Sequence, residues 1–498
     1  MTQINKRILS LILAALTCAS LLVACNSGKE AEKTSETVPA PEDADETSVR
    51  VTEYARDLAT EHKLEGITFV YAGGYQQPEF EEETGNIEND ALYKRQRDIE
   101  EIFEIDIVNA ELKVDSNSTS GHEVVDSVKR AVMAGTKDYD LVAGNFMVVA
   151  HPLFNGQCLE DVSSFSVLNL DEQWWPATLR DTHSIAGKLY FLTGPIITNY
   201  YGDGVCVLFN KKIMTDFGIE EPYELVKSGE WTFDKMTELA SAIPYNTDGA
   251  GVYRYGKPNG MGVLYGFGYR VTQFDDEGIP YVEASLPIRL SDIADKVSVI
   301  MGDDSQSVNC KYDTLKEQPL DKYGMEYEDM FVADRILFLF NSTDTAASLR
   351  EKDVEFGILP VPKENKEQRS YYSYADAWSS RFCYVPVCTK DLAVTDVVVE
   401  AMAALSLKHI KPAYFDKLLK GRSTYDNDSR EMLDTLFNSK VYDIIGIYSL
   451  GDINQTGPFV RSIEKAVEYD TTSISSDYMV YAKMANKQID RIMAMVNR

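Results

Sequence analysis

Apolar runs of strand length alternate with helix-length amphipathic segments in the N-terminal part of the chain. Ile67–Tyr71 is an apolar strand, a helix with one apolar side is predicted from about Asp90 to Glu104, and Ile105–Val108 is a second strand. A helix that joins two strands makes a βαβ unit, which places the strands parallel with a right-handed crossover. A helix at 124–134 and a strand at Tyr139–Ala143 continue the alternation, so the sequence predicts an α/β fold.

The rest of the chain adds further strands and helices. Strands are predicted at Asp203–Phe209 and Phe382–Val387, and Ile336–Phe340 is apolar at every position, as in a strand buried on both faces. Thr232 is the predicted N-cap of a helix, because its hydroxyl can accept a bond from the first turn. A long amphipathic helix is predicted from Ser473 to Arg498.

The N-terminal segment has three parts. Two basic residues precede an apolar run from Ile8 to Val23, which is shorter than the roughly 20 residues that cross a bilayer. The run closes on Leu22-Val23-Ala24-Cys25, which resembles the lipobox of bacterial lipoproteins. The resemblance implies a signal peptide at 1–24, a lipid on the Cys25 thiol, and localisation at the extracytoplasmic face of the cell membrane. The alternative is an ordinary cleavage site beside a chance cysteine.

The segment after the lipobox differs in composition from the rest of the chain. Residues 25–62 are rich in Glu, Asp, Ser, Thr and Pro, with no aromatic side chain before Tyr54, so we predict a disordered acidic tether. Over all 498 residues, 79 acidic and 49 basic side chains give a formal net charge of −30. Such a surface repels nucleic acid, and we expect no nucleic-acid partner.

Sequence patterns for catalysis or metal binding are lacking. The five histidines are far apart, and the chain has no His-Glu-x-x-His, Gly-x-Ser-x-Gly, P-loop or Cys-x-x-Cys pattern. We therefore predict no catalytic residues, no metal site and no cofactor.

Several short segments, in order, resemble the sugar-binding branch of the extracellular solute-binding proteins (family 1) that serve ABC importers. The resemblance covers about Ile67 to Leu407. The segments that carry it are Tyr139–Val142, Gly156–Val162, Ala186–Tyr190, Val207–Lys212, Phe217–Ile219, Pro222, Trp231–Asp234, Phe331–Phe340 and Ile358–Pro362. Two departures concern the sugar contacts: Asp334-Arg335 replaces the family's Gly-Lys, and Asp376-Ala377-Trp378 replaces its Gly-Gly.

The resemblance implies a two-lobed, periplasmic-binding-protein-like fold of type II. Each lobe would hold a mainly parallel sheet flanked by helices, with a hinge of crossing segments between the lobes. The expected boundaries are 63–195 plus 330–380 for lobe one and 200–328 plus 386–498 for lobe two. The crossings are expected near Gly194–Gly204, Glu328–Ala333 and Ser379–Pro386.

Ligand would bind between the lobes, at the carboxyl ends of the strands. A sugar offers apolar ring faces and many hydroxyls, so its site needs aromatic, amide and carboxylate side chains. Trp174 and Trp175 are adjacent, so one of them can pack while the other faces the ligand. The candidate ligand-binding residues follow strands or lie at crossings: Tyr75, Asn145, Trp175, Tyr201, Asp203, Asn341, Asp344 and Trp378.

The function that the resemblance implies is capture, without chemistry. A lipid-anchored monomer would bind a sugar or oligosaccharide and hand it to the permease subunits of an ABC transporter. One alternative is a binding protein for a non-sugar solute, such as a peptide or an anion, or an adhesin. Another is a surface glycoside hydrolase, which would need two carboxyl groups about 5–10 Å apart.

Overall fold

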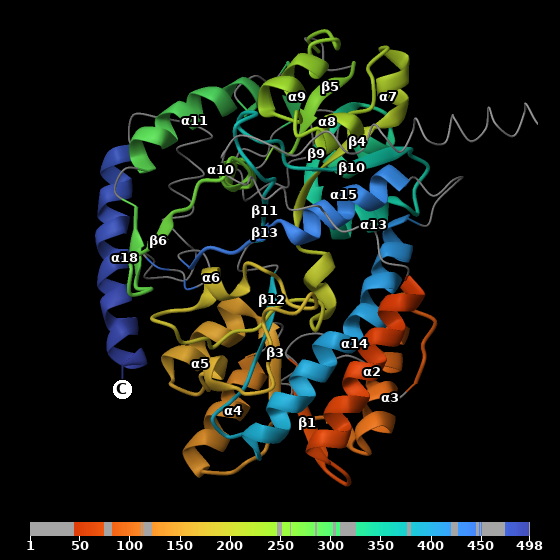
Figure 1. The fold of residues 1–498 in the computed structure, drawn as a ribbon. Coiled ribbons are helices and arrows are strands. Elements are labelled where there is room, and N and C mark those ends of the chain that lie inside the picture. Colours follow the sequence, from red (N-terminus) through yellow and green to blue (C-terminus); the bar gives the residue numbers. More distant parts are fainter. Residues whose placement is uncertain are drawn as a thin grey trace, which may run out of the picture. The chain divides into compact units, whose positions relative to one another are not determined.

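Two sheets organise the part of the chain that the computed structural model describes. This part is residues 44–497, without 74–81, 111, 113–121, 247–250, 259, 284–285, 302–304, 309–324, 376–379, 420–426, 445–447, 449 and 451–473. A four-stranded sheet has the order β12-β3-β1-β2, and a five-stranded sheet has the order β10-β4-β9-β5-β8. We call the part built on the first sheet lobe one and the part built on the second lobe two (Figure 1).

Lobe one contains the predicted βαβ unit. Its strands are β1 (Thr68–Gly73), β2 (Asp106–Asn109), β3 (Leu141–Asn145) and β12 (Arg381–Tyr384). α3 (Ile87–Phe103) connects β1 to β2, and α4 (His122–Ala134) precedes β3. β1 pairs in parallel with β2 and with β3, whereas β12 is antiparallel to β3.

A helix lies where the sequence predicts a disordered tether. α2 (Ala44–His62) packs against α3 and α14 (Leu392–Leu419), and the three helices lie side by side (Figure 1). Val51, Ala55 and Leu58 are buried, because spacings of four and three residues place them on one stripe of the helix. The tether prediction is therefore wrong for residues 44–62. The solvent-facing side of this helix is acidic, so the composition of the segment did not reveal its short apolar stripe. Residues 25–43, including Cys25, lie outside the described part.

Lobe two holds a mixed sheet. Its strands are β4 (Val205–Asn210), β5 (Tyr253–Gly256), β8 (Ser307–Val308), β9 (Ile336–Ser342) and β10 (Phe356–Pro360). β4 is antiparallel to β9 and β10, while β5 is parallel to β8 and β9. The first five residues of β9 are at most 1% exposed, which confirms the prediction of a buried apolar strand at Ile336–Phe340.

The boundaries of the lobes differ from the prediction. β9 and β10 pair with β4, so the assignment of 330–380 to lobe one is wrong for these strands. A fully apolar strand fits the middle of either sheet, and its composition does not show which strand it joins. The assignment of 386–498 to lobe two is wrong for the first half of α14, whose Val397, Ala401 and Leu405 belong to the core of lobe one.

The chain passes from lobe one to lobe two between Leu192, bridged to Cys383, and Val205, the first residue of β4. The expected crossing at Glu328–Ala333 is wrong, because α12 (Tyr327–Val332) packs against β9 within lobe two. The chain returns to lobe one between β10 and β12. α14 then runs from lobe one into lobe two, where Tyr414 and Phe415 join the core under β9 and β10.

The remaining elements cover the two sheets and build the connections between them. α18 packs against α11 and β7 and agrees with the helix predicted over Ser473–Arg498, and Thr232 caps α9 by accepting from the Lys235 amide, as predicted. These elements are η1 (Phe146–Ala150), α5 (His151–Asn155), η2 (Val162–Ser164), α6 (Leu179–His183), η3 (Thr198–Tyr201), α7 (Lys211–Asp216), α8 (Tyr223–Lys227), α9 (Phe233–Ala240), α10 (Gly260–Gly266), β6 (Thr272–Phe274), β7 (Pro280–Val282), α11 (Leu286–Met301), α13 (Thr343–Leu349), β11 (Ser373–Tyr374), α15 (Asn427–Asn438), β13 (Lys440–Val441) and α18 (Ile474–Val496).

Candidate functional site

Four of the predicted ligand-binding residues gather at one edge of the lobe-two sheet. β9 ends beside the start of β4, so Asn341 and Asp344 meet the segment that carries Tyr201 and Asp203. The Asp344 amide donates to the Gly202 carbonyl at 3.1 Å. A side chain at Gly202 would lie within 2.5 Å of the Asp344 carboxylate, so this close approach needs glycine. The sequence argument thus brought together residues that are neighbours in space.

Protein groups already bind the side-chain polar atoms of three of these four residues. The Lys440 ammonium donates to the Asp203 carboxylate, and both side chains are buried. The Tyr414 hydroxyl donates to Asp344 at 2.5 Å, and the Asn341 amide donates to Glu328 at 2.7 Å. In the described structure this edge is a joint at which the first crossing segment is fixed to lobe two.

Trp174 and Trp175 both pack in the core of lobe one. Their indole nitrogens donate to the two carboxylate oxygens of Glu400 at 3.0 and 2.9 Å, and both side chains are buried. Glu400 also accepts from the Tyr54 hydroxyl at 3.1 Å, which ties α2 to α14. The expectation that one of the two tryptophans faces the ligand does not agree with this arrangement.

Of the other predicted residues outside the tryptophan pair, the structure describes Asn145, which lies at the carboxyl end of a strand in the lobe-one sheet. Asn145 ends β3 opposite Arg381, and its side chain accepts from the Val148 amide at 2.8 Å, which caps η1. Tyr75, two residues beyond the end of β1, and Trp378, three residues before β12, lie outside the described residues.

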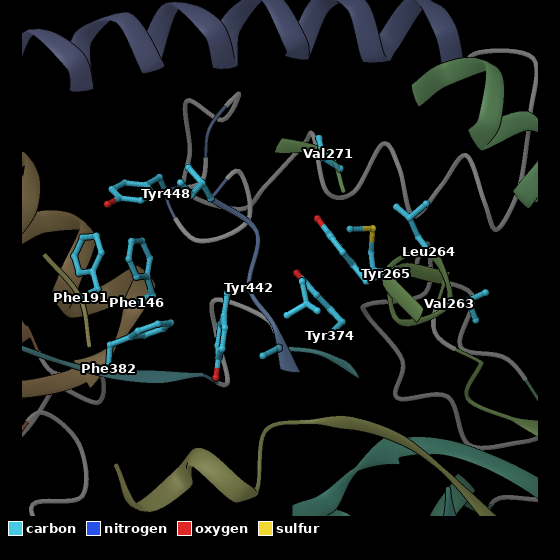
Figure 2. Close-up of a cluster of buried hydrophobic side chains, with 14 of the residues drawn as sticks. Phe146, Phe191, Val263, Leu264, Tyr265, Val271, Tyr374, Phe382, Tyr442 and Tyr448 are labelled. Carbon is cyan, nitrogen blue, oxygen red and sulfur yellow. The ribbon is translucent and has the colours of Figure 1, made fainter. Parts of the chain in front are cut away.

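Aromatic rings of both lobes meet in a cluster that the sequence argument missed (Figure 2). We define the interlobe cluster as Phe146, Phe191 and Phe382 of lobe one, Tyr265 and Tyr374 of lobe two, and Tyr442 and Tyr448 of the segment after β13. Phe146 is the residue directly after Asn145, at the carboxyl end of β3, so its place in the sequence is a signal that could have identified it. Tyr442 and Tyr448 follow no predicted strand, and nothing local marks them.

Ring contacts run through the lobe-one side of this cluster. The Tyr448 ring centroid lies 5.4 Å from that of Phe146 and 5.2 Å from that of Phe191, and Phe382 lies 5.7 Å from Phe146. Tyr442 continues the series at 5.5 Å from Phe382. Figure 2 shows Tyr442 between the phenylalanines and the tyrosines of lobe two.

The lobe-two side ends in a stacked pair of tyrosines. The rings of Tyr265 and Tyr374 are 4.6 Å apart and nearly parallel, at 5°. Asp443 joins the segment after β13 to β6, since its carboxylate accepts from the Val271 and Thr272 amides at 3.0 and 3.2 Å. The segment after β13 therefore contacts both lobes.

Several buried polar atoms belong to this cluster, contact it or lie close to it in sequence. Among the residues that the structure describes, none offers a hydrogen-bond partner to His183 Nε2, to the Tyr448 hydroxyl or to Ser380 Oγ, two residues before Phe382. Burial lowers the pKa of His183 to about 3 and raises the pKa of Tyr448 well above its usual value, so both side chains are neutral at pH 7. Buried polar atoms without partners are rare in folded proteins, and each one needs an explanation.

The cluster suits a neutral ligand with apolar faces and hydroxyl groups. Ring faces pack against the C–H faces of a sugar, while neutral donors and acceptors bond to its hydroxyls. In the part of the chain described here, no group of three or more His, Cys, Asp or Glu side chains could hold a metal ion. Within the same residues, no helix is long and apolar enough to cross a membrane.

No family model and no curated protein matches this chain in sequence. Solved structures match its fold. The apo form of RafE from Streptococcus pneumoniae matches with a TM-score of 0.52 and 15% identity, over 85% of this chain and 98% of RafE. A sugar transporter from Rhizobium etli, in an open conformation, matches with a TM-score of 0.54 and 14% identity, over 84% and 99%. A cyclo/maltodextrin-binding protein in complex with maltotetraose matches with a TM-score of 0.53 and 13% identity, over 86% and 97%.

The chain has the fold of these three structures, with one lobe built on each of its two larger sheets. Within this solute-binding-protein fold, the interlobe cluster draws its rings from both lobes and from the segment that follows β13. The predicted two-lobed α/β class is thereby confirmed. The expectation of a mainly parallel sheet in each lobe is wrong for lobe two, where β4 is antiparallel to both of its neighbours.

Proposed function

We propose that this protein captures a carbohydrate between its two lobes and delivers it to the permease of an ABC importer. The observation that supports the proposal is the interlobe cluster, whose aromatic rings come from both lobes and lie beside the His183 ring, and whose buried, neutral His183 Nε2 and Tyr448 hydroxyl have no hydrogen-bond partner among the described residues. The cyclo/maltodextrin-binding protein of the same fold is complexed with maltotetraose, which supports an oligosaccharide as ligand here. In this proposal the protein acts as a monomer, and it performs no chemistry on the sugar.

A sugar that binds should raise the thermal stability of the protein. A ligand that binds only the folded state adds RT ln(1 + [L]/Kd), about 2.7 kcal/mol at a hundredfold excess over Kd. We expect differential scanning fluorimetry to show a raised melting temperature with at least one member of a panel of mono- and oligosaccharides that includes maltotetraose and raffinose. A panel of peptides should have no effect.

The variant Tyr442→Ala tests the place of binding. It removes a ring at the centre of the interlobe cluster, so the sugar-induced shift should be lost. Tyr478→Ala is the matched control, because it removes an equally buried tyrosine from α18, where it bonds to the Glu283 carbonyl. An equal sugar-induced shift in both variants would place the ligand elsewhere.

We further propose that a lipid on Cys25 holds the protein at the extracytoplasmic face of the membrane. Cys25→Ser removes the thiol that would be acylated, so the protein should move from the membrane fraction to the soluble fraction of expressing cells. Cys18→Ser is the matched control, because Cys18 lies inside the apolar run and should be removed with the signal peptide. A Cys25→Ser protein that still sediments with membranes contradicts the anchor. Immunoblots of both fractions make the measurement.

A further inference from the structure

His183 is the last residue of α6, and its ring is part of the lobe-one side of the site. The imidazole lies 4.9 Å from the Tyr442 ring and 5.6 Å from the Phe382 ring, measured between centroids. Its side chain is almost completely buried. The sequence argument did not select this residue, since the histidines showed no pattern typical of metal binding or catalysis.

The neighbours of His183 Nδ1 decide which ring nitrogen carries the proton. Nδ1 lies 3.1 Å from the Leu179 carbonyl and 2.8 Å from Thr182 Oγ1. Thr182 donates its single hydroxyl proton to the Thr178 carbonyl at 2.7 Å, so its oxygen can only accept from the imidazole. Both neighbours of Nδ1 are therefore acceptors, and Nδ1 must be the protonated nitrogen.

Nε2 is consequently a bare acceptor. A neutral imidazole has one N–H and one lone pair, and the lone pair here is on Nε2. Among the described residues no donor reaches it, although the side chain is buried. An acceptor buried without a partner is unfavourable, and a donor supplied by a ligand removes this unfavourable contribution.

We propose that His183 Nε2 accepts a hydrogen bond from one hydroxyl of the bound sugar, and that this bond makes the site specific for sugars with a hydroxyl at that position. The inference rests on the proposed function and adds one atom-level contact to it. The Phe382 and Tyr442 rings beside the imidazole offer apolar faces on which the same sugar ring can pack. A site built to bond a hydroxyl discriminates strongly against an analogue that lacks it, because the protein atom is then left unpaired.

Two substitutions of His183 test the roles of its two ring nitrogens separately. The amide nitrogen of asparagine falls near the place of Nδ1, so His183→Asn keeps a donor for the Leu179 carbonyl and removes Nε2. The amide of glutamine reaches the place of Nε2, so His183→Gln keeps an acceptor there and gives up the Nδ1 contact. We expect isothermal titration calorimetry to show a 10- to 100-fold higher Kd for His183→Asn with the best sugar of the panel, and a smaller increase for His183→Gln.

Monodeoxy analogues of that sugar complete the test. The wild type should bind one of these analogues 10- to 100-fold more weakly than the parent sugar. His183→Asn should bind this analogue and the parent sugar equally well. His409→Asn, on α14 beside Asp98, is the control histidine and should bind like the wild type. Equal affinity of wild type and His183→Asn for every sugar would overturn this inference alone, whereas a wild type that binds no sugar would overturn the proposed function with it.

Nitrogen-15 NMR gives a further test. If His183 had a purely structural role, its Nε2 resonance would not respond to the sugar. In the sugar-free protein, labelled with ¹⁵N in its histidines, Nε2 of His183 should have the chemical shift of an unprotonated nitrogen without a hydrogen bond. Addition of the sugar should move this resonance in the direction expected for an accepted hydrogen bond. A protonated Nε2, or a resonance that sugar does not move, would overturn the inference.

Discussion

Replacing Lys440 with methionine should lower the free energy of unfolding by about 3–5 kcal/mol. The Lys440 ammonium donates to the Asp203 carboxylate, and each of the two side chains is only 1% exposed. Methionine keeps most of the apolar stem, but it removes the positive charge beside a buried carboxylate. Burial lowers the pKa of Lys440, while the neighbouring Asp203 carboxylate opposes that effect.

Two further variants test this interpretation. The double variant Asp203→Leu/Lys440→Met removes both charges and should be more stable than Lys440→Met alone, because no uncompensated charge remains buried. Lys366→Met makes the same substitution in an exposed ion pair with Glu230 and should leave the unfolding free energy nearly unchanged. Urea denaturation followed by circular dichroism measures all three. If Lys440→Met is as stable as Lys366→Met, the ion pair does not hold this joint.

Lys440 also contacts lobe one and the first crossing segment. Thr178, next to α6 of lobe one, donates its hydroxyl to the Lys440 carbonyl at 3.1 Å. The Lys440 ammonium lies 4.2 Å from the ring centroid of Tyr200, in the first crossing segment. Ser373, on the chain that returns to lobe one, donates to the Val205 carbonyl at 2.8 Å. Polar contacts therefore hold the crossing segments together in this structure.

Local patterns in the sequence predicted the elements but not their partners. The first βαβ unit, the buried strand at β9 and the cap at Thr232 depend on residues close in sequence, so periodicity and capping rules were sufficient. The partner of β9 is set by the β4 strand more than 120 residues earlier, and an apolar strand carries no signal for that choice. The lobe boundaries were misplaced for this reason.

In the candidate site, too, local sequence features were predicted and contacts with distant segments were not. Tyr201, Asp203, Asn341 and Asp344 were selected as residues next to strands, and strand pairing does bring them together. Their bonds to Lys440, Tyr414 and Glu328 depend on distant segments, so the sequence did not show that protein groups occupy them. The interlobe cluster is assembled from seven separate places in the chain, and only Phe146 follows a strand that the sequence predicted.

Replacing Glu400 with alanine should cost about 3–5 kcal/mol of unfolding free energy, because four donors converge on this one buried carboxylate. The indole N–H groups of Trp174 and Trp175, the Tyr54 hydroxyl and the Asn169 amide all donate to it. Alanine leaves these donors unpaired and opens a cavity, and each loss is destabilising. Replacing Glu400 with glutamine should lower the free energy of unfolding by about 1–3 kcal/mol. The glutamine carbonyl can accept a hydrogen bond from one indole N–H, while its NH₂ group faces the other.

The pH dependence of Glu400→Gln tests the ionisation of this group. Burial raises the pKa of Glu400 to about 7, against the opposing effect of its donors, whereas the unfolded chain titrates near 4.5. Between these two pH values the folded protein binds more protons at Glu400 than the unfolded chain does. The contribution of this protonation to the free energy of unfolding is therefore fully present below pH 4.5 and is lost as the pH rises through 7. A shift of this size is worth at most about 3 kcal/mol. Glutamine does not titrate, so urea denaturation should show a larger stability difference between wild type and Glu400→Gln at pH 5.5 than at pH 8. A difference that stays constant between the two pH values would mean that the carboxylate is already ionised at pH 5.5 and that its four donors outweigh its burial.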